Sequence, residues 1–140
     1  MSIQMVLLPV FVEVALTFVL MFWMARARVA AVSGGECKVR DIALRQPNWP
    51  VGVTQIGNAY HNQLELPVLF YVLTGLALVT KLADLAFVLL AWLFVATRVA
   101  HAYIMVTSNH VPRRFRAFAI GAFTLMAMWI VFIVRVLITL

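Results

Sequence analysis

Charged residues are scarce in this 140-residue chain: they make up 11% of it, whereas 65% of its residues are hydrophobic. An ordinary soluble domain is about half apolar and about a quarter charged, so this composition argues against a water-soluble globule. A soluble core of this size could not bury so much apolar surface, but a lipid bilayer can accept it. The sequence therefore predicts a small integral membrane protein.

Cysteine occurs once, as Cys37, which excludes an intramolecular disulfide framework and a multi-cysteine zinc site. The three histidines have no carboxylate or cysteine partners at ligand spacing, so we expect no metal site. Internal repeats and low-complexity tracts are absent as well. We therefore expect one membrane domain over residues 1–140.

What the chain does have is long hydrophobic runs. At about 1.5 Å per residue, a run of about 20 apolar residues crosses a hydrocarbon core of about 30 Å. The runs predict an all-α bundle of four transmembrane helices at about 5–25, 56–80, 84–108 and 114–138. They are too long for barrel strands and lack an alternating pattern. The very short second connection makes the second and third helices antiparallel neighbours.

The basic side chains gather in two of the three connections. The first connection, about residues 26–53, and the third hold eight of them: Arg26, Arg28, Lys38, Arg40, Arg45, Arg113, Arg114 and Arg116. The positive-inside rule then places both connections in the cytoplasm and both termini outside, as in a multi-pass protein of a bacterial inner membrane. Topology and anionic lipid headgroups thus explain the net charge of +6 without a nucleic-acid partner.

Polar residues open the second helix, where lipid would exclude them. Asn58, His61, Asn62 and Glu65 follow the spacing i, i+3, i+4, i+7, which puts them on one helix face. A stripe of amides, imidazole and carboxylate cannot face lipid, so it must meet another helix or a bound polar ligand.

Two other helices bring charge to the same depth of the membrane. Arg98 and His101 share a face near the end of the third helix, and a cluster of arginines opens the fourth. One interpretation is a buried Glu65–Arg98 ion pair with the amides joining helices. The excess of arginine favours an anion site instead, because a guanidinium offers a fixed fork of donors to carboxylates.

These residues resemble the motifs of the MAPEG family (membrane-associated proteins in eicosanoid and glutathione metabolism), in particular bacterial-type members similar to microsomal glutathione transferase. Asn62-Gln-Leu-Glu65-Leu-Pro67 resembles the Asn-x-x-Glu…Pro signature that opens the family's second helix. The segment from Arg98 through His101 to Tyr103 resembles its third-helix motif, and Pro112-Arg113-Arg114 resembles the start of its fourth helix. Length and the pattern of spans and connections agree over essentially the whole chain.

The resemblance implies a homotrimer of four-helix bundles that binds glutathione between subunits, in the cytoplasmic half of the membrane. It also implies catalysis of glutathione transfer or peroxide reduction on lipophilic molecules that arrive from the bilayer. Arg114 corresponds best to the arginine that holds the thiolate, with Arg116 as its competitor. The implied glutathione-binding residues are Asn58, His61, Asn62, Glu65, Arg98, His101, Tyr103, Arg113, Arg26 and Arg28.

Two positions depart from the family pattern. Many glutathione-binding members have an arginine four residues before the asparagine, where this chain has Asn58, and Arg26 or Arg28 could replace that cation. Phe118 stands where the family has tyrosine or phenylalanine, and it offers no hydroxyl to a thiol. These departures leave open a second hypothesis, a lipid- or ligand-binding protein of the same family without catalysis.

A third hypothesis comes from Glu13, which lies near mid-membrane in the first helix and close in depth to Arg98. It either pairs with an arginine or carries a proton. With Thr17 one turn later, it is similar to the small multidrug resistance transporters, which would make the chain a proton-coupled exporter. The long basic first connection and the strong charge bias do not fit that class.

Overall fold

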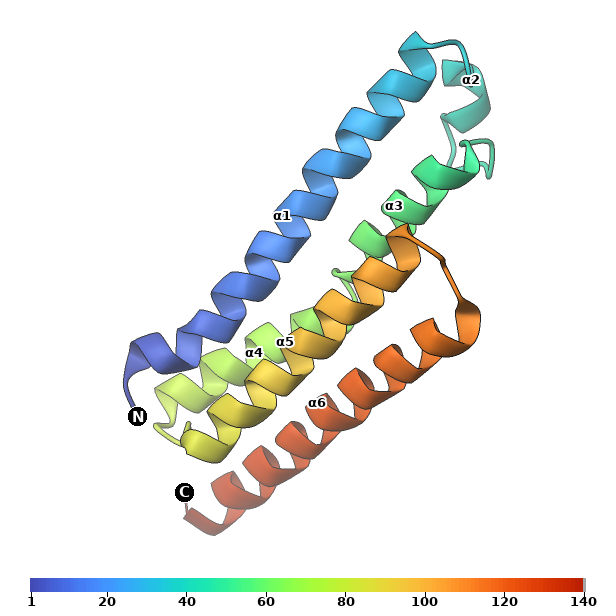
Figure 1. The fold of residues 1–140 in the computed structure, drawn as a ribbon. Coiled ribbons are helices and arrows are strands. Elements are labelled where there is room, and N and C mark those ends of the chain that lie inside the picture. Colours follow the sequence, from blue (N-terminus) through green and yellow to red (C-terminus); the bar gives the residue numbers. More distant parts are fainter. Residues whose placement is uncertain (140) are drawn as a thin grey trace.

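The computed structural model describes residues 1–139, which form an all-helical bundle (Figure 1). Four segments are long and apolar enough to cross a membrane. They are α1 (Ile3–Ser33), α3 with α4 (Val51–Asn62 and Leu66–Val79), α5 (Leu85–Val106) and α6 (Val111–Thr139). A short helix, α2 (Val39–Ile42), lies in the connection between α1 and α3. The predicted all-α fold with four transmembrane helices is confirmed.

The first helix is longer than the sequence predicted, since it ends at Ser33 and not near residue 25. Its additional turns are rich in alanine and arginine, which favour helix, and Ala31 is buried there. At 1.5 Å per residue α1 is about 46 Å long, more than a hydrocarbon core of about 30 Å. The expected loop of residues 26–53 therefore shrinks to 34–50. The end of α1, α2 and the start of α3 project beyond α5 and α6 (Figure 1).

The second span begins at Val51, earlier than predicted, and is broken near its middle. Pro67 has no N–H for the carbonyl of Gln63, and its ring would clash with that carbonyl in a regular helix. As a result α3 ends at Asn62, α4 begins at Leu66, and Glu65 between them is non-helical, at φ −98° and ψ −107°. The third and fourth helices begin and end within three residues of the predicted positions.

Apolar side chains from all the spans fill the interior. Phe70 of α4 and Phe94 of α5 are fully buried, with their ring centroids 4.9 Å apart. A smaller cluster joins Leu20, Ala59 and Met105 from three different helices. Because α5 packs against α1, α3 and α6, its inward-facing positions lie in the middle of the bundle.

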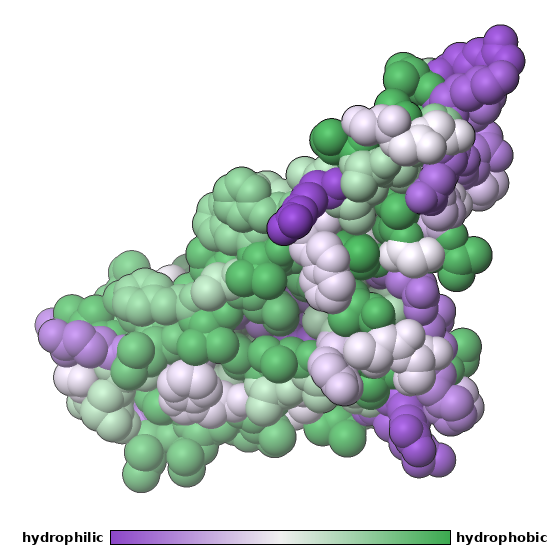
Figure 2. All heavy atoms as spheres, turned by 45° about the horizontal axis from the view of Figure 1, so that its top comes forward, coloured by the Kyte–Doolittle hydropathy of each residue, from purple (hydrophilic) through white to green (hydrophobic). Residues whose placement is uncertain are grey.

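Basic residues mark one end of the molecule, called the basic end below: residues 34–50, residues 107–110 and the helix turns that adjoin them. The start of α1 and the end of α6 lie at the opposite end (Figure 1). Figure 2 shows hydrophobic residues over the middle of the visible face and most of the hydrophilic residues gathered at one end. This distribution fits a bundle whose middle is surrounded by lipid.

Candidate functional site

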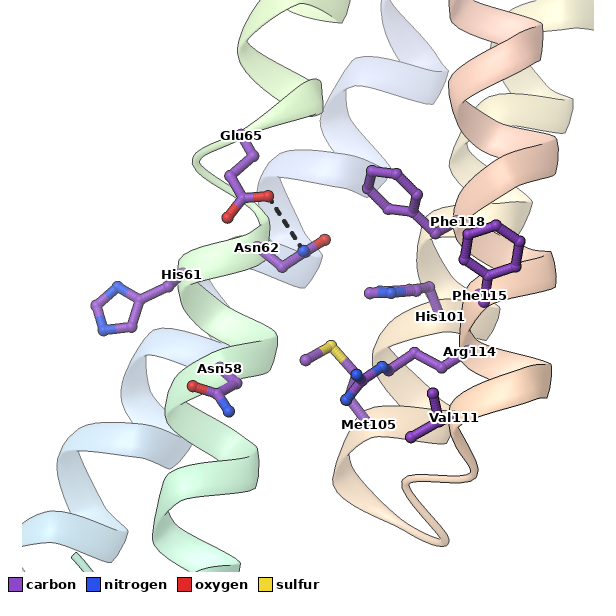
Figure 3. Close-up of a pocket in the computed structure, with 10 residues that line it drawn as sticks. All are labelled: Asn58, His61, Asn62, Glu65, His101, Met105, Val111, Arg114, Phe115 and Phe118. Atoms are coloured by element: carbon purple, nitrogen blue, oxygen red, sulfur yellow. Dashed lines mark hydrogen bonds between the residues drawn. The ribbon is translucent and has the colours of Figure 1, made fainter. Parts of the chain in front are cut away.

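A cavity of about 420 Å³ lies near the basic end, between α3 on one side and α5 and α6 on the other (Figure 3). This volume is in the range of pockets that bind small molecules. Carboxylate, amide, imidazole, guanidinium and aromatic groups all reach it. The lining residues are Asn58, His61, Asn62, Glu65, His101, Met105, Val111, Arg114, Phe115 and Phe118.

The polar stripe predicted from the sequence forms one wall of this cavity, since all of its residues line it. Asn58 and Asn62 stand on α3, and Glu65 follows where the helix is broken. The Asn62 side-chain amide donates to Glu65 Oε2 at 3.3 Å. His61 points away from the α5–α6 wall, so its ring lies at the rim of the cavity (Figure 3).

Arg114 is the cation of the opposite wall, and its side chain extends from α6 toward α3 (Figure 3). Its Nη1 donates to Asn109 Oδ1 at 2.8 Å. Asn109 adopts a left-handed conformation, with φ 49°, which asparagine tolerates better than most residues. The connection that precedes α6 thereby holds the guanidinium in place.

Arg98 lies behind the α3 wall and is only 1% exposed. Its Nη2 donates to the backbone carbonyl of Asn62 at 3.1 Å and also to Asn62 Oδ1. A cation at this position stabilises the C-terminal end of a helix, where carbonyl groups lack helical partners. Within residues 1–139, Arg98 forms no direct ion pair with Glu65, so the interpretation of a buried Glu65–Arg98 ion pair is wrong, and Arg98 instead contacts Asn62.

Of the remaining predicted site residues, only His101 lines this cavity. His101 is buried beside the cavity, and its ring centroid is 5.9 Å from that of Phe118. Tyr103 is 67% exposed on the outer side of α5. Three arginines are exposed and do not line the cavity: Arg26, Arg113 and Arg116. Of the two arginines proposed for catalysis, only Arg114 therefore reaches the cavity.

Arg28 belongs to a second cavity of about 450 Å³, under the 34–50 connection. Its guanidinium lies 5.1 Å from the centroid of the Trp49 ring, in cation–π contact. Arg45 also lines this cavity, and Asn58 and His61 line both cavities. The two cavities are thus adjacent, and the second brings two arginines to the edge of the first.

Glu13 is fully buried, at 0% exposed, and lines neither cavity. It forms no ion pair with Arg98 in the described part of the chain. An exporter needs a carboxylate that protons and ligand can reach in turn. The position of Glu13 therefore gives the exporter hypothesis no support.

Sequence reasoning missed three cavity residues, Met105, Val111 and Phe115. Val111 and Phe115, together with the predicted Arg114 and Phe118, repeat the spacing i, i+3, i+4, i+7 on α6, the same spacing as the polar stripe. That spacing was a usable signal, but three of the four residues are apolar and look like ordinary membrane positions. Asn109 gave a weaker signal, as a residue that favours turns next to a short connection.

A model of the MAPEG family matches residues 6–134 of the 140-residue chain. The matched residues include the polar stripe, Arg98, Arg114 and the residues of both cavities. The resemblance that the helix-opening motifs indicated is therefore confirmed. No curated protein and no solved structure shows a significant match to the chain.

Proposed function

Because the chain belongs to the MAPEG family, we propose that it is a membrane-embedded, glutathione-dependent transferase or peroxidase. Its second substrate would be a lipophilic electrophile that enters from the bilayer. The observation that carries the proposal is the position of Arg114 across the cavity from Asn58, Asn62 and Glu65.

The groups that line the cavity suit glutathione. This tripeptide carries an ammonium group, two carboxylates, two peptide groups and a thiol. Glu65 is the acidic residue of the lining and suits the ammonium group, while Asn58 and Asn62 can both donate to and accept from peptide groups.

Arg114 supplies the catalytic part of the proposal. A guanidinium beside a thiol favours the thiolate, which is the nucleophilic form. Phe115 and Phe118 flank this position with apolar surface, which suits a lipophilic electrophile and keeps water away from the sulfur. We assign Arg114 to stabilising the thiolate and leave Arg116 outside the site.

Arg28 and Arg45 would supply the positive charge that many glutathione-binding members of the family have at the position of Asn58. They line the second cavity, which adjoins the first at Asn58 and His61. A glutathione carboxylate that passes Asn58 would reach these guanidiniums. A charge-assisted hydrogen bond of this kind contributes about 1.5–3 kcal/mol.

The wider proposal follows the family. The chain would assemble as a homotrimer in which a neighbouring subunit closes the open side of the cavity, with the basic end in the cytoplasm. Native mass spectrometry of the detergent-solubilised protein tests the trimer. Accessibility of the Cys37 thiol in inside-out and right-side-out vesicles tests the orientation.

The decisive experiment is glutathione binding to the solubilised protein, followed by thiolate absorbance. We expect saturable binding at millimolar glutathione and a thiolate signal that Arg114→Ala abolishes. Arg116→Ala is the matched control, since it removes an exposed arginine two residues away, and it should leave the signal intact. Absence of saturable binding would refute the enzyme proposal, and loss of signal only in Arg116→Ala would transfer the role to that residue.

One observation favours a second candidate, a ligand-binding protein of the family without catalysis. Phe118 lines the cavity without a hydroxyl group, so it cannot donate a hydrogen bond to a thiolate. Saturable glutathione binding with no thiolate signal in the wild-type protein would support this candidate against the enzyme.

A further inference from the structure

The Arg28 guanidinium is held by two neighbours that carry no charge. The centroid of the Trp49 ring lies 5.1 Å from it. On α3, Gly57 leaves room for the guanidinium, since a Cβ atom at position 57 would be 3.2 Å from Arg28 Nη2. Arg28 forms no ion pair within residues 1–139, and its Nε is buried there without a hydrogen-bond partner. The cation is therefore positioned in advance, while its charge is not compensated.

Arg45 adds a second cation to the second cavity, which Arg28 also lines. The acidic residues of the 34–50 connection, Glu36 and Asp41, do not line this cavity. Arg45 has a left-handed backbone, at φ 61°, which is uncommon for a residue other than glycine or asparagine. Residues held in such conformations cluster at ligand sites. The second cavity thus presents two guanidiniums and no carboxylate.

The depth of Arg28 in the membrane indicates which anions reach it. Counted from Met5, where the first apolar run begins, Arg28 lies about 35 Å along α1. The hydrocarbon core is about 30 Å thick, and each headgroup layer adds about 5–7 Å. The guanidinium therefore lies at the level of the lipid phosphates. Trp49 beside it fits this level, because tryptophan is enriched at membrane–water interfaces.

A hollow of about 260 Å³, called the outer hollow here, adjoins the second cavity, and Arg28 and Trp49 line both. Val29 and Val32 provide its apolar surface, and Val29 is 65% exposed on α1. An acyl chain in the outer hollow would place its headgroup beside the Arg28 guanidinium. The two hollows together suit a molecule that has one anionic and one apolar part.

We infer that the second cavity binds a phosphate group between the guanidiniums of Arg28 and Arg45. The planar fork of a guanidinium matches two phosphate oxygens. Lipid headgroups and soluble phosphate compounds share this chemistry. The outer hollow favours the lipid, and the two uncompensated cations favour a lipid with net negative charge.

Lipid retention tests the inference. The detergent-solubilised protein is mixed with equal amounts of phosphatidylglycerol, which is anionic, and phosphatidylcholine, which is zwitterionic, and native mass spectrometry measures what stays bound. We expect the wild type to prefer phosphatidylglycerol, and each of Arg28→Ala and Arg45→Ala to lower that preference about fivefold. Arg26→Ala removes an exposed arginine that lines neither hollow, so it should keep the preference.

A glycine pair tests the geometry without changing any charge. Gly57→Ala displaces the end of the Arg28 side chain and should lower the preference for phosphatidylglycerol. Gly52→Ala is the matched control on the same helix, because a Cβ atom there meets nothing within 4 Å, and it should keep the preference. If Arg28→Ala does not fold, Arg45→Ala decides, since Arg45 lies in an exposed connection outside the bundle.

Isothermal titration with inorganic phosphate distinguishes the two sources of the phosphate group. A preference for phosphatidylglycerol that depends on Arg28, without binding of inorganic phosphate, would support the site and assign it to the lipid. Binding of inorganic phosphate that Arg28→Ala abolishes, without a lipid preference, would support the site and assign it to a soluble compound. The inference is overturned if neither ligand depends on Arg28 and Arg45.

Competition with glutathione gives a second readout, and this part rests on the proposed function, which gives the same two guanidiniums a glutathione carboxylate. Glutathione affinity in lipid nanodiscs should be lower with phosphatidylglycerol than with phosphatidylcholine, and the difference should shrink in Arg45→Ala. Retention of phosphatidylglycerol through Arg28, combined with no glutathione binding by the wild type in either membrane, would support the phosphate site and refute the proposed function.

Discussion

Gly121 of α6 lies so close to Thr97 of α5 that a Cβ atom at position 121 would be 2.6 Å from Thr97 Oγ1. The Thr97 hydroxyl donates to the carbonyl of Phe94 at 2.6 Å, so a displacement of Thr97 would cost this hydrogen bond. Small residues at such positions let transmembrane helices approach closely. This contact sets the spacing and rotation of α6 against α5, and both helices line the cavity.

The close approach predicts that Gly121→Ala destabilises the bundle. The added methyl group forces α5 and α6 apart or displaces Thr97, and overpacking of this kind costs about 1–3 kcal/mol. Thermal unfolding in detergent measures the effect. Gly75→Ala is the matched control, because a Cβ at Gly75 of α4 meets nothing within 4 Å. The unfolding temperature of Gly75→Ala should equal or slightly exceed that of the wild type. An equal fall in the unfolding temperature of both variants would contradict the prediction.

An ion pair at the opposite end of the bundle predicts a pH-dependent stability. Asp84 lies 2.7 Å from Arg135 and caps α5 by accepting from the Phe87 N–H at 2.9 Å. The Phe87 N–H and then Arg135 lower the pKa of Asp84 below its ordinary value of 3.8. The stabilisation is therefore present above pH 3.8 and is lost as the pH falls through the lower folded-state pKa.

Asp84→Asn isolates the charge, because asparagine is also a good helix cap. We expect a loss below about 1 kcal/mol at pH 7, since both partners are partly exposed. The difference in unfolding temperature between wild type and variant should shrink as the pH is lowered through the Asp84 pKa. An unchanged difference between pH 7 and pH 3 would argue against the ion pair as its source.

Helical periodicity was sufficient to predict one wall of the cavity, because a stripe at i, i+3, i+4, i+7 faces one way however the bundle packs. Periodicity could not predict whether Arg114 or Arg116 faces the cavity, since that depends on the rotation of α6. The contact between Gly121 and Thr97 fixes that rotation, and no local pattern in the sequence reveals it.

The partner of Arg98 was unpredictable for a different reason. The sequence offers Glu13 and Glu65 as acidic partners, whereas the structure joins Arg98 to Asn62. That contact requires a free carbonyl at Asn62, which follows from the helix break before Pro67. Proline was visible in the sequence, but which carbonyl it would free, and for which donor, depends on how α5 packs against α3.

The contact between Asn109 and Arg114 predicts that a residue outside the cavity affects the proposed thiolate. Asn109→Gly keeps the left-handed backbone without strain and removes only the acceptor that holds Arg114. We expect a normal unfolding temperature and a weaker glutathione thiolate signal, less reduced than in Arg114→Ala. Ser108→Gly adds the same flexibility one residue earlier, and it should leave the signal unchanged. Equal thiolate signals in wild type and Asn109→Gly would show that Asn109 does not position the guanidinium.

The second cavity predicts that Arg28 contributes to glutathione affinity although it lies outside the main cavity. Its Nε is buried without a hydrogen-bond partner in the described chain, and Trp49 holds the guanidinium beside Asn58 and His61. Arg28→Ala should weaken binding by about 1.5–3 kcal/mol, the contribution of a charge-assisted hydrogen bond to a carboxylate. The exposed Arg26, two residues earlier on the same helix, provides the control, and Arg26→Ala should change affinity little.

Isothermal titration of both variants with glutathione and with its glycine amide tests whether Arg28 contacts the glycine carboxylate. If Arg28 binds the glycine carboxylate, the amide should bind wild type and Arg28→Ala equally, whereas a loss common to both ligands would exclude the glycine carboxylate as the partner of Arg28.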